Sequence, residues 1–590
     1  MAGARRSGGH ARPCWLAGSP RRLRTRTLSV ARLTDLHGSI SERARRWGLL
    51  PAYHGWQGEV VETTPAAEAA ILDAMGANTD TPPPQPEPQL PHDRCEEAPE
   101  RTWGWAIQLY ALRSRNSWGI GDLADLRRFA RWSRGAGAAL ILLNPLGAQT
   151  PGLRYQSSPY YASTRRFRNV VFLCVGEVEG ADGVDIRPAL EAARHLNAQR
   201  IIDYDAVFRT KTSALEEIFR AAPRPRGLAA YARRQGGALR DYATFNALCE
   251  EYGPAWRDWP DEIRHPSAPG IRSARERLAD RIAFHAWLQF HVDRQLARAA
   301  REIGLITDVP VGFAADGFDA WRWQDFLAPQ MRIGAPPDEF FRDGQDWGLP
   351  PFNPWALAEA QWAPFIDAIR SASSHAAGIR LDHVMGLFRL FWIPEGMPAA
   401  HGAYVHYPAD ILLSLLANES RRAEAFVIGE DLGLVEPVVR RRLAEIGSLS
   451  YRLVWFESSH PEMWPHDAVA AVGTHDLPTV AGIWRRSEPE HRLHHLRDKL
   501  VQLTQLPDDA HPVDVTVAVY RHLAQGRPRI VLASLEDALA VQERPNVPGT
   551  IGEFPNWRLA LPATLEEIEE ADGVLRIVNE MAEAGRSAGR

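Results

Sequence analysis

Cysteine is scarce: the 590 residues contain only Cys14, Cys95, Cys174 and Cys249. More than 70 residues separate each from the next, so the sequence has no CxxC pair. A disulfide framework or a zinc site of the usual spacing is therefore not expected, and a reducing compartment such as the cytoplasm is favoured. Apolar runs are also short, because none reaches the ~18–20 residues that a membrane span needs. We expect a cytoplasmic protein without a membrane partner.

The chain also has little excess charge. Its formal net charge is −5, which gives no general reason to expect a nucleic-acid partner. Lysine is nearly absent, since only Lys211 and Lys499 occur among 68 basic residues, a bias typical of GC-rich codon usage. Hydrophobic residues make up 45% and charged residues 24%, as in a folded protein with a full core. Tryptophan is abundant, with 20 residues, and indole rings either stack on sugars or fill cores.

Composition divides the chain into four parts. Residues 1–34 hold eight arginines and no acid, so we expect a disordered basic extension or an early start codon, although a transit peptide has a similar composition. Residues 35–78 are amphipathic and predict a small N-terminal helical domain. Residues 79–97 include six prolines and predict an extended linker. Residues 98–590 are expected to form the main domain, with inserted subdomains.

Short apolar strands alternate with longer helical patterns after the linker. The expected strands are Ala139–Leu143, Leu305–Val311, Ile379–Leu381, Ala425–Ile428, Tyr451–Phe456, Ala468–Val472 and Arg529–Ala533. Such alternation predicts βαβ units and a parallel sheet. Six of these strands are followed closely by an acid: Asp308, Asp382, Glu430, Glu457, Asp476 and Glu536. In a (β/α)8 barrel these strand ends meet at one face, so the pattern favours an α/β barrel with an acid-lined mouth.

Two of these acids differ in their surroundings. Arg380 and Asp382 are two residues apart and should share one face of their strand. We expect Arg380 to lower the pKa of Asp382 and keep it ionised, as a nucleophile requires; a structural Arg–Asp pair is the alternative. Glu430 follows Val427-Ile-Gly without an adjacent cation, so poor solvation should raise its pKa, as a general acid requires. A helix N-cap is the alternative there.

The third acid follows a histidine, in the step His475-Asp476 at a strand end. This pair offers a donor and an acceptor to vicinal hydroxyls. No HExxH-type spacing indicates a metal site, and the sequence has no GxSxG elbow or P-loop, so neither a metal nor another cofactor is expected. Three carboxylates at strand ends without a serine or cysteine nucleophile suit glycosidic bond chemistry.

The sequence resembles the 4-α-glucanotransferase family (amylomaltase, or disproportionating enzyme), in particular its bacterial maltodextrin-utilisation branch. The runs that carry the resemblance are GIRLDHVMGLFRLFWIPEG, AYVHYPADILLSLLANES, VIGEDLG and GTHDLPT. Further runs follow in family order, among them WGWAIQLYALRSRNSWGIGDLADL, SSPYYASTRRFRN, GAPPDEFFRDGQDWGLPPFNP and NVPGTIGEFPNWRLAL. The similarity spans about residues 100–565. The SPYYASTRRFRN segment departs from the family pattern, which indicates a differently shaped loop near Tyr160.

The resemblance implies an interrupted (β/α)8 TIM barrel of the α-amylase clan with helical insertions. It also implies that the enzyme transfers α-1,4-glucan segments between maltooligosaccharides by a retaining double displacement. It assigns Asp382 as nucleophile, Glu430 as acid/base and Asp476 as transition-state stabiliser. The substrate-binding residues that it implies are Tyr160, Asp308, Asp338, Gln345, Trp347, Arg380, His383, His475 and Asn546.

Two other functions fit the same residues. A hydrolase of the same clan would use the same carboxylates with an open acceptor site. A non-catalytic glucan-binding or regulatory protein would retain a degenerate barrel, but all three carboxylates and Arg380 are present. The sequence leaves open whether the protein is a monomer or a homodimer, and which glucan lengths it prefers.

Overall fold

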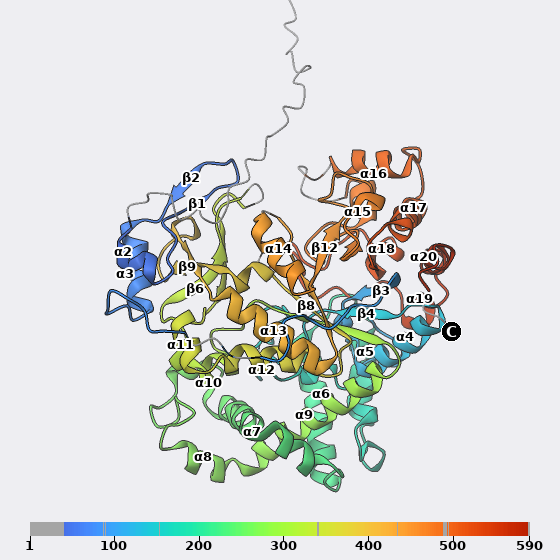
Figure 1. The fold of residues 1–590 in the computed structure, drawn as a ribbon. Coiled ribbons are helices and arrows are strands. Elements are labelled where there is room, and N and C mark those ends of the chain that lie inside the picture. The colour runs from blue at the N-terminus through green and yellow to red at the C-terminus, as the bar shows by residue number, and fades with distance from the viewer. Residues whose placement is uncertain are drawn as a thin grey trace, which may run out of the picture.

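Eight parallel strands close into a barrel at the centre of the computed structural model (Figure 1). The structure describes residues 40–587 except 86, 87, 89, 153, 339, 340, 434, 488–492, 494 and 551. The basic extension expected at residues 1–34 lies outside the described residues. The barrel strands, in chain order, are β3 (Thr102–Ile107), β4 (Leu140–Leu143), β5 (Gly304–Val309), β8 (Gly378–Leu381), β11 (Phe426–Gly429), β12 (Leu449–Leu453), β13 (Ala468–Ala471) and β14 (Ile530–Ser534). The expected barrel fold is confirmed.

The sequence analysis placed seven of these strands and missed β3. This strand reads TWGWAI, which lacks the aliphatic run of β4 (LILL) or β14 (IVLAS). Its glycine has a packing reason, because a Cβ on Gly104 would lie 2.2 Å from the carbonyl oxygen of Leu140 on the neighbouring strand. Trp103 and Trp105 point outward and are completely buried under the helices.

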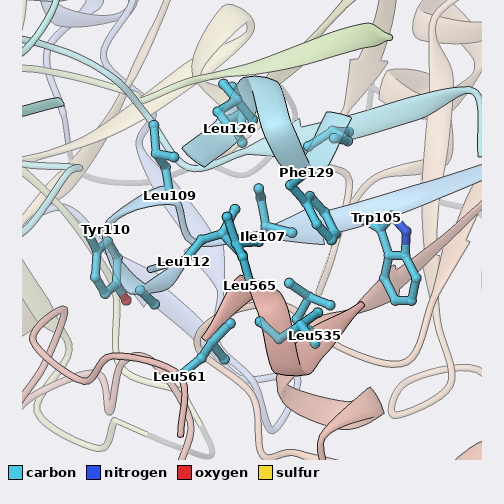
Figure 2. Close-up of a cluster of buried hydrophobic side chains, with 14 of the residues drawn as sticks. Trp105, Ile107, Leu109, Tyr110, Leu112, Leu126, Phe129, Leu535, Leu561 and Leu565 are labelled. Carbon is cyan, nitrogen blue, oxygen red and sulfur yellow. The ribbon is translucent and has the colours of Figure 1, made fainter. Parts of the chain in front are cut away.

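Helices cover the outside of the barrel. Figure 2 shows one part of this core, where Trp105 and Ile107 of β3 face Leu126 and Phe129 of α4. The helices between or after the barrel strands are α4 (Leu123–Gly135), α9 (Ala279–Ala300), α12 (Ala363–Ala372), α13 (Ala409–Ala423), α14 (Pro437–Glu445), α15 (Val480–Trp484), α16 (Leu496–Thr504), α17 (Pro512–Gln525), α18 (Leu535–Ala538), α19 (Leu565–Ile568) and α20 (Asp572–Glu583).

The barrel interior is a separate apolar cluster that includes Leu142, Ile306, Ile428 and Leu532. These inward positions alternate with outward ones along each strand, as strand geometry requires. Toward the carboxyl ends of β5 and β8 the inward side chains become polar, namely Asp308 and Arg380. The change places buried charge directly beneath the barrel mouth.

The first and last barrel strands are joined by β14–β3 pairing, with Ile530 opposite Thr102. Arg586, which follows α20, is completely buried beside this seam. Its guanidinium donates to the carbonyl oxygens of Ala524 and Gly526 at 2.6 Å and of Thr102 at 3.3 Å. A residue near the end of the described chain therefore fixes the point where the barrel closes.

Insertions after β4, β5 and β8 interrupt the barrel. Between β4 and β5 lie α5 (Arg187–Asn197), α6 (Tyr204–Ala221), α7 (Leu228–Tyr252) and α8 (Ile271–Arg277). Between β5 and β11 the chain adds α10 (Phe318–Arg322), α11 (Pro354–Glu359) and the strands β6 (Met331–Ala335), β7 (Gln345–Leu349), β9 (Arg389–Pro394) and β10 (Ala403–His406). These four strands form one sheet in the order β10-β9-β6-β7, with antiparallel neighbours.

The described part of residues 35–78 is not purely helical. It contains α2 (Glu42–Arg46) and α3 (Pro65–Ala74), as expected, but also a two-stranded sheet of β1 (Ala52–His54) and β2 (Val60–Glu62). Hydrophobic periodicity predicted only helices here. Each of the two strands has only three residues, which is too short to show an alternating pattern. Ala44, Trp47 and Ile71 belong to the same buried cluster as the inserted sheet. The domain boundaries themselves stay a prediction.

No helix among the described residues is long and apolar enough to cross a membrane.

Candidate active site

A cleft of about 1020 Å³ opens at the carboxyl ends of the barrel strands. Such a volume suits a ligand of several sugar rings better than a single ring. Nine of the residues expected to form the site line it: Tyr160, Gln345, Trp347, Asp382, His383, Glu430, His475, Asp476 and Asn546. The structure thus brings together side chains that are up to 386 positions apart in the sequence.

Arg380 connects the floor of this cleft to Asp382. Its Nη1 donates to both carboxylate oxygens of Asp308, at 2.7 and 2.6 Å. Its Nη2 lies 3.3 Å from Oδ1 of Asp382. The prediction that Arg380 and Asp382 share one face of β8 is confirmed. Asp308 and Arg380 are almost completely buried below the cleft instead of lining it.

The expected lowering of the pKa of Asp382 is wrong. Burial raises this pKa to about 6, and Arg380 offsets only part of the effect, while Asp308 adds to it. Burial is the largest cause, and Asp308, whose two oxygens accept hydrogen bonds from Nη1 of Arg380, offsets much of the positive charge that would keep Asp382 ionised. The sequence showed the arginine but gave no sign that a second acid would pair with it.

Glu430 has a higher pKa than Asp382, and the prediction of a raised value is confirmed. Burial raises the pKa of Glu430 to about 8, although Arg380 lowers it. The two carboxylate oxygens accept hydrogen bonds from the backbone N–H groups of His383, at 2.9 Å, and Leu432, at 3.1 Å. These bonds fix the carboxyl group in place. At neutral pH Asp382 is mostly ionised and Glu430 mostly protonated.

Asp476 is surrounded by donors. Asn546 Nδ2 donates to its Oδ1 at 2.6 Å, and His475 Nε2 lies 3.4 Å from its Oδ2. Burial opposes ionisation, but His475 and Asn546 outweigh it, so the pKa of Asp476 is lowered. Burial likewise disfavours the charged His475, yet Asp476 raises its pKa overall. Asp476 is therefore a permanent negative charge in the cleft.

Tyr160 lies on the loop after β4, and its side chain contacts Asp308 and His475. Its hydroxyl donates to Oδ2 of Asp308 at 2.5 Å and lies 3.3 Å from Nδ1 of His475. The ring centroids of Tyr160 and His475 are 4.7 Å apart, and the Trp557 ring is 5.4 Å from that of Tyr160. A cluster of aromatic rings therefore borders the carboxylates, and the face of such a ring can stack on a sugar.

Gln345 and Trp347 lie on β7, where their alternate spacing turns both toward the cleft. The Trp347 ring meets that of His383 edge-on, with the centroids 5.3 Å apart. Burial lowers the pKa of His383 to about 4, so its imidazole is neutral. Asp338 is not among the described residues that line the cleft. Its carboxylate accepts from the backbone N–H of Phe341 at 2.6 Å, which closes a turn.

Two acids expected at the barrel mouth lie elsewhere. The Glu457 carboxylate is 3.0 Å from Nη1 of Arg452, which points outward from β12. The strand ends at Leu453, earlier than expected, and Glu457 is not among the described residues that line the cleft. Glu536 lies on α18 and lines a small buried cavity beneath His475.

The sequence analysis missed several residues of the cleft. Arg544 Nη1 donates to the backbone carbonyl of Asp476 at 2.8 Å. Trp557 is buried against His475, with ring centroids 4.9 Å apart. Phe456 and Ile201 present exposed apolar side chains at the rim. Only the aromatic character of Trp557, within the run NVPGTIGEFPNW, gave a signal that could have found it.

Comparisons with known proteins agree with this arrangement. A family model described as 4-alpha-glucanotransferase matches residues 107–564. The 4-alpha-glucanotransferase of Mycobacterium tuberculosis (strain ATCC 25618 / H37Rv) is 39% identical over 536 residues, covering 80% of this chain and 73% of that protein. The Haemophilus influenzae 4-alpha-glucanotransferase is 32% identical over 534 residues, covering 78% and 76% respectively. The amylomaltase structure from Corynebacterium glutamicum shares the fold, with a TM-score of 0.80, 24% identity and coverage of 92% and 99%.

Proposed function

The chain belongs to the 4-α-glucanotransferase family, and on that premise we propose how its cleft transfers α-1,4-glucan segments between maltooligosaccharides. It is an enzyme that acts by transglycosylation, and the hydrolase alternative is not favoured because its relatives are transferases. The observation that carries the residue roles is the separation of two pKa values in one cleft. Asp382 titrates near 6 and Glu430 near 8.

In the first step Asp382 attacks the anomeric carbon of the donor glucan. The bond to the leaving oxygen breaks as Glu430 gives its proton to that oxygen, and a β-glycosyl ester forms on Asp382. Arg380, 3.3 Å from Asp382, holds the attacking carboxylate in place. The lowered pKa of Asp476 keeps this carboxylate negative beside the developing oxocarbenium charge.

In the second step the ionised Glu430 takes a proton from the 4-hydroxyl of an acceptor glucan. That oxygen attacks the anomeric carbon, the ester to Asp382 breaks, and an α-1,4 bond is restored after two inversions. Transfer exceeds hydrolysis when acceptor sugars exclude water from the cleft. Trp347, Tyr160 and Trp557 supply aromatic faces for those sugars.

Product analysis of maltotriose incubations tests this function. A transferase converts maltotriose to glucose and longer glucans, because each glycosyl group leaves one chain and extends another. A hydrolase yields only shorter products. Chromatograms that contain no product longer than maltotriose at early times would contradict the proposal.

The pH dependence of transfer follows from the same two groups. The reactive form has Asp382 ionised and Glu430 protonated, so kcat/KM should rise as the pH passes about 6 and fall above about 8. Initial rates on maltotriose between pH 4 and pH 10 check this prediction. A profile without an alkaline fall would contradict Glu430 as the acid. A rate that is highest below pH 4 would contradict Asp382 as the nucleophile.

Replacing Trp347 with alanine should lower the ratio of transfer to hydrolysis by about 2- to 10-fold, the amount expected for one lost aromatic contact. Total donor consumption should change less. Trp347→Phe keeps a ring and should recover most of the ratio. Trp56→Ala serves as a control, since Trp56 is 37% exposed on the β1–β2 hairpin and does not line the described cleft. Equal falls in transfer and consumption would instead mean that Trp347 only anchors β7.

We further propose that the enzyme acts on maltodextrins in the cytoplasm, without a nucleic-acid or membrane partner. Free thiols at Cys95, Cys174 and Cys249 support a reducing compartment. Cell fractionation with an assay for transfer activity tests the location, and activity confined to the membrane pellet or the medium would contradict it.

A further inference from the structure

A second cavity lies on the outside of the barrel, away from the cleft. Its volume is about 390 Å³, and its walls come from α7, α9, α12 and the segment 166–168. Within the part of the chain that the structure describes, it shares no lining residue with the cleft. Any ligand bound here would therefore be distinct from the glucan.

Positive charge dominates this cavity. Five arginines line it: Arg166, Arg168, Arg234, Arg370 and Arg422. Three carboxylates belong to the same network. Asp367 pairs with Arg166, and Glu419 pairs with both Arg370 and Arg422. Asp293 lies 3.0 Å from Nε2 of His375. The five arginines outnumber the three carboxylates by two.

Arg168 and Arg234 are the two lining arginines whose hydrogen-bond and ring partners among the described residues are all neutral. Arg168 donates to the hydroxyl of Ser371 at 2.9 Å and to the backbone carbonyl of the same residue, which are both neutral acceptors. Burial lowers the pKa of Arg168 to about 10, and Asp293 offsets only part of that effect. Arg234 is exposed at the opening, with its guanidinium 5.9 Å from the centroid of the Tyr231 ring. Neither guanidinium has a carboxylate within ion-pair distance among the described residues.

We propose that this cavity binds the phosphoryl group of a phosphate monoester. A phosphate monoester carries about −1.5 to −2 charges at neutral pH, which matches the net excess of two positive charges in this network. Arginine forks donate to phosphate oxygens in pairs, and the hydroxyls of Ser371 and Ser374 line the same wall. The volume exceeds that of a phosphate group, and Gln235 on the wall suits a hydroxylated body of hexose size.

Calorimetric titration of the full-length protein with glucose 1-phosphate tests the proposal, with inorganic phosphate and glucose as separate probes. We expect one saturable site for glucose 1-phosphate that weakens as salt rises, and no binding of glucose at the same concentrations. Tighter binding of the ester than of inorganic phosphate would assign the hexose body to the cavity. Equal binding of the ester and of inorganic phosphate would mean that the cavity recognises only the phosphoryl group.

A matched pair of double variants places the binding in this cavity. Arg234→Gln with Arg422→Gln removes two lining charges and should weaken binding of glucose 1-phosphate at least 10-fold. Arg233→Gln with Arg421→Gln removes two charges at the adjacent positions, outside this cavity, and should bind like the wild type. Both variants should retain wild-type transfer on maltotriose, which shows that they fold. Absence of saturable binding up to 10 mM, or equal binding by both double variants, would overturn the proposal.

Discussion

Asp382→Asn should reduce transfer by several powers of ten, because an amide cannot form the glycosyl ester on which both steps depend. The side chain keeps its size, and Arg380 keeps its two bonds to Asp308, so the fold should survive. Loss should be equally complete with maltotriose and with α-glucosyl fluoride, since attack by Asp382 is required for both donors. Initial rates on the two donors, with thermal unfolding as a check on stability, measure this.

Asp467→Asn provides the control for this substitution. Asp467 precedes β13 at the opposite end of the barrel, where its side chain is 69% exposed and pairs with Arg529. The same chemical change there should leave transfer within about 2-fold of the wild type, as for most exposed substitutions. If Asp382→Asn retained a tenth or more of the wild-type rate, the nucleophile would have to be another residue.

Glu430→Gln should lose about 10²- to 10⁴-fold on maltotriose, the contribution of a general acid–base group. It should still react with α-glucosyl fluoride, because fluoride leaves without a proton. The covalent intermediate should then accumulate, since the glutamine cannot activate an acceptor. Mass spectrometry of the denatured variant after donor addition should locate one glucosyl group on the peptide that contains Asp382.

The two variants test the roles of the two carboxyl groups against each other. The alkaline fall in the pH profile should also vanish in Glu430→Gln when α-glucosyl fluoride is the donor, because glutamine does not titrate. A glucosyl group on a peptide without Asp382 would mean that the two carboxyl groups have exchanged roles, or that Asp382 is not the nucleophile. Equal loss on both donors would show that Glu430 does more than transfer a proton.

Sequence periodicity was sufficient for most of the barrel. Strands such as β4, with LILL, and β14, with IVLAS, are runs of mostly aliphatic residues. β3 was missed because two tryptophans and a glycine replace that pattern, and only its packing against β4 explains the glycine. The hairpin of β1 and β2 was missed because three-residue strands have no measurable period.

The sequence predicted the three carboxyl groups of the site, but not all of their pKa values or neighbouring residues. Asp382, Glu430 and Asp476 follow strands whose carboxyl ends must meet, so barrel geometry alone brings them together. The raised pKa of Asp382 could not be predicted, because it depends on how deeply the carboxyl group is buried and on Asp308, which is 74 positions away in sequence. Glu457 was misplaced because the sequence does not show where β12 ends. Trp557 was missed because it reaches the cleft on a long loop that folds back over the barrel.

Closure of the barrel by its first and last strands has a consequence for protein synthesis. More than 400 residues separate β3 from β14, so β3 leaves the ribosome long before its second neighbour exists. Until then one edge of β3 offers unpaired N–H and C=O groups, and such an edge pairs readily with other chains. Arg586, which secures the seam, is translated later still. The nascent chain should therefore depend on chaperone protection until β14 and Arg586 have left the ribosome.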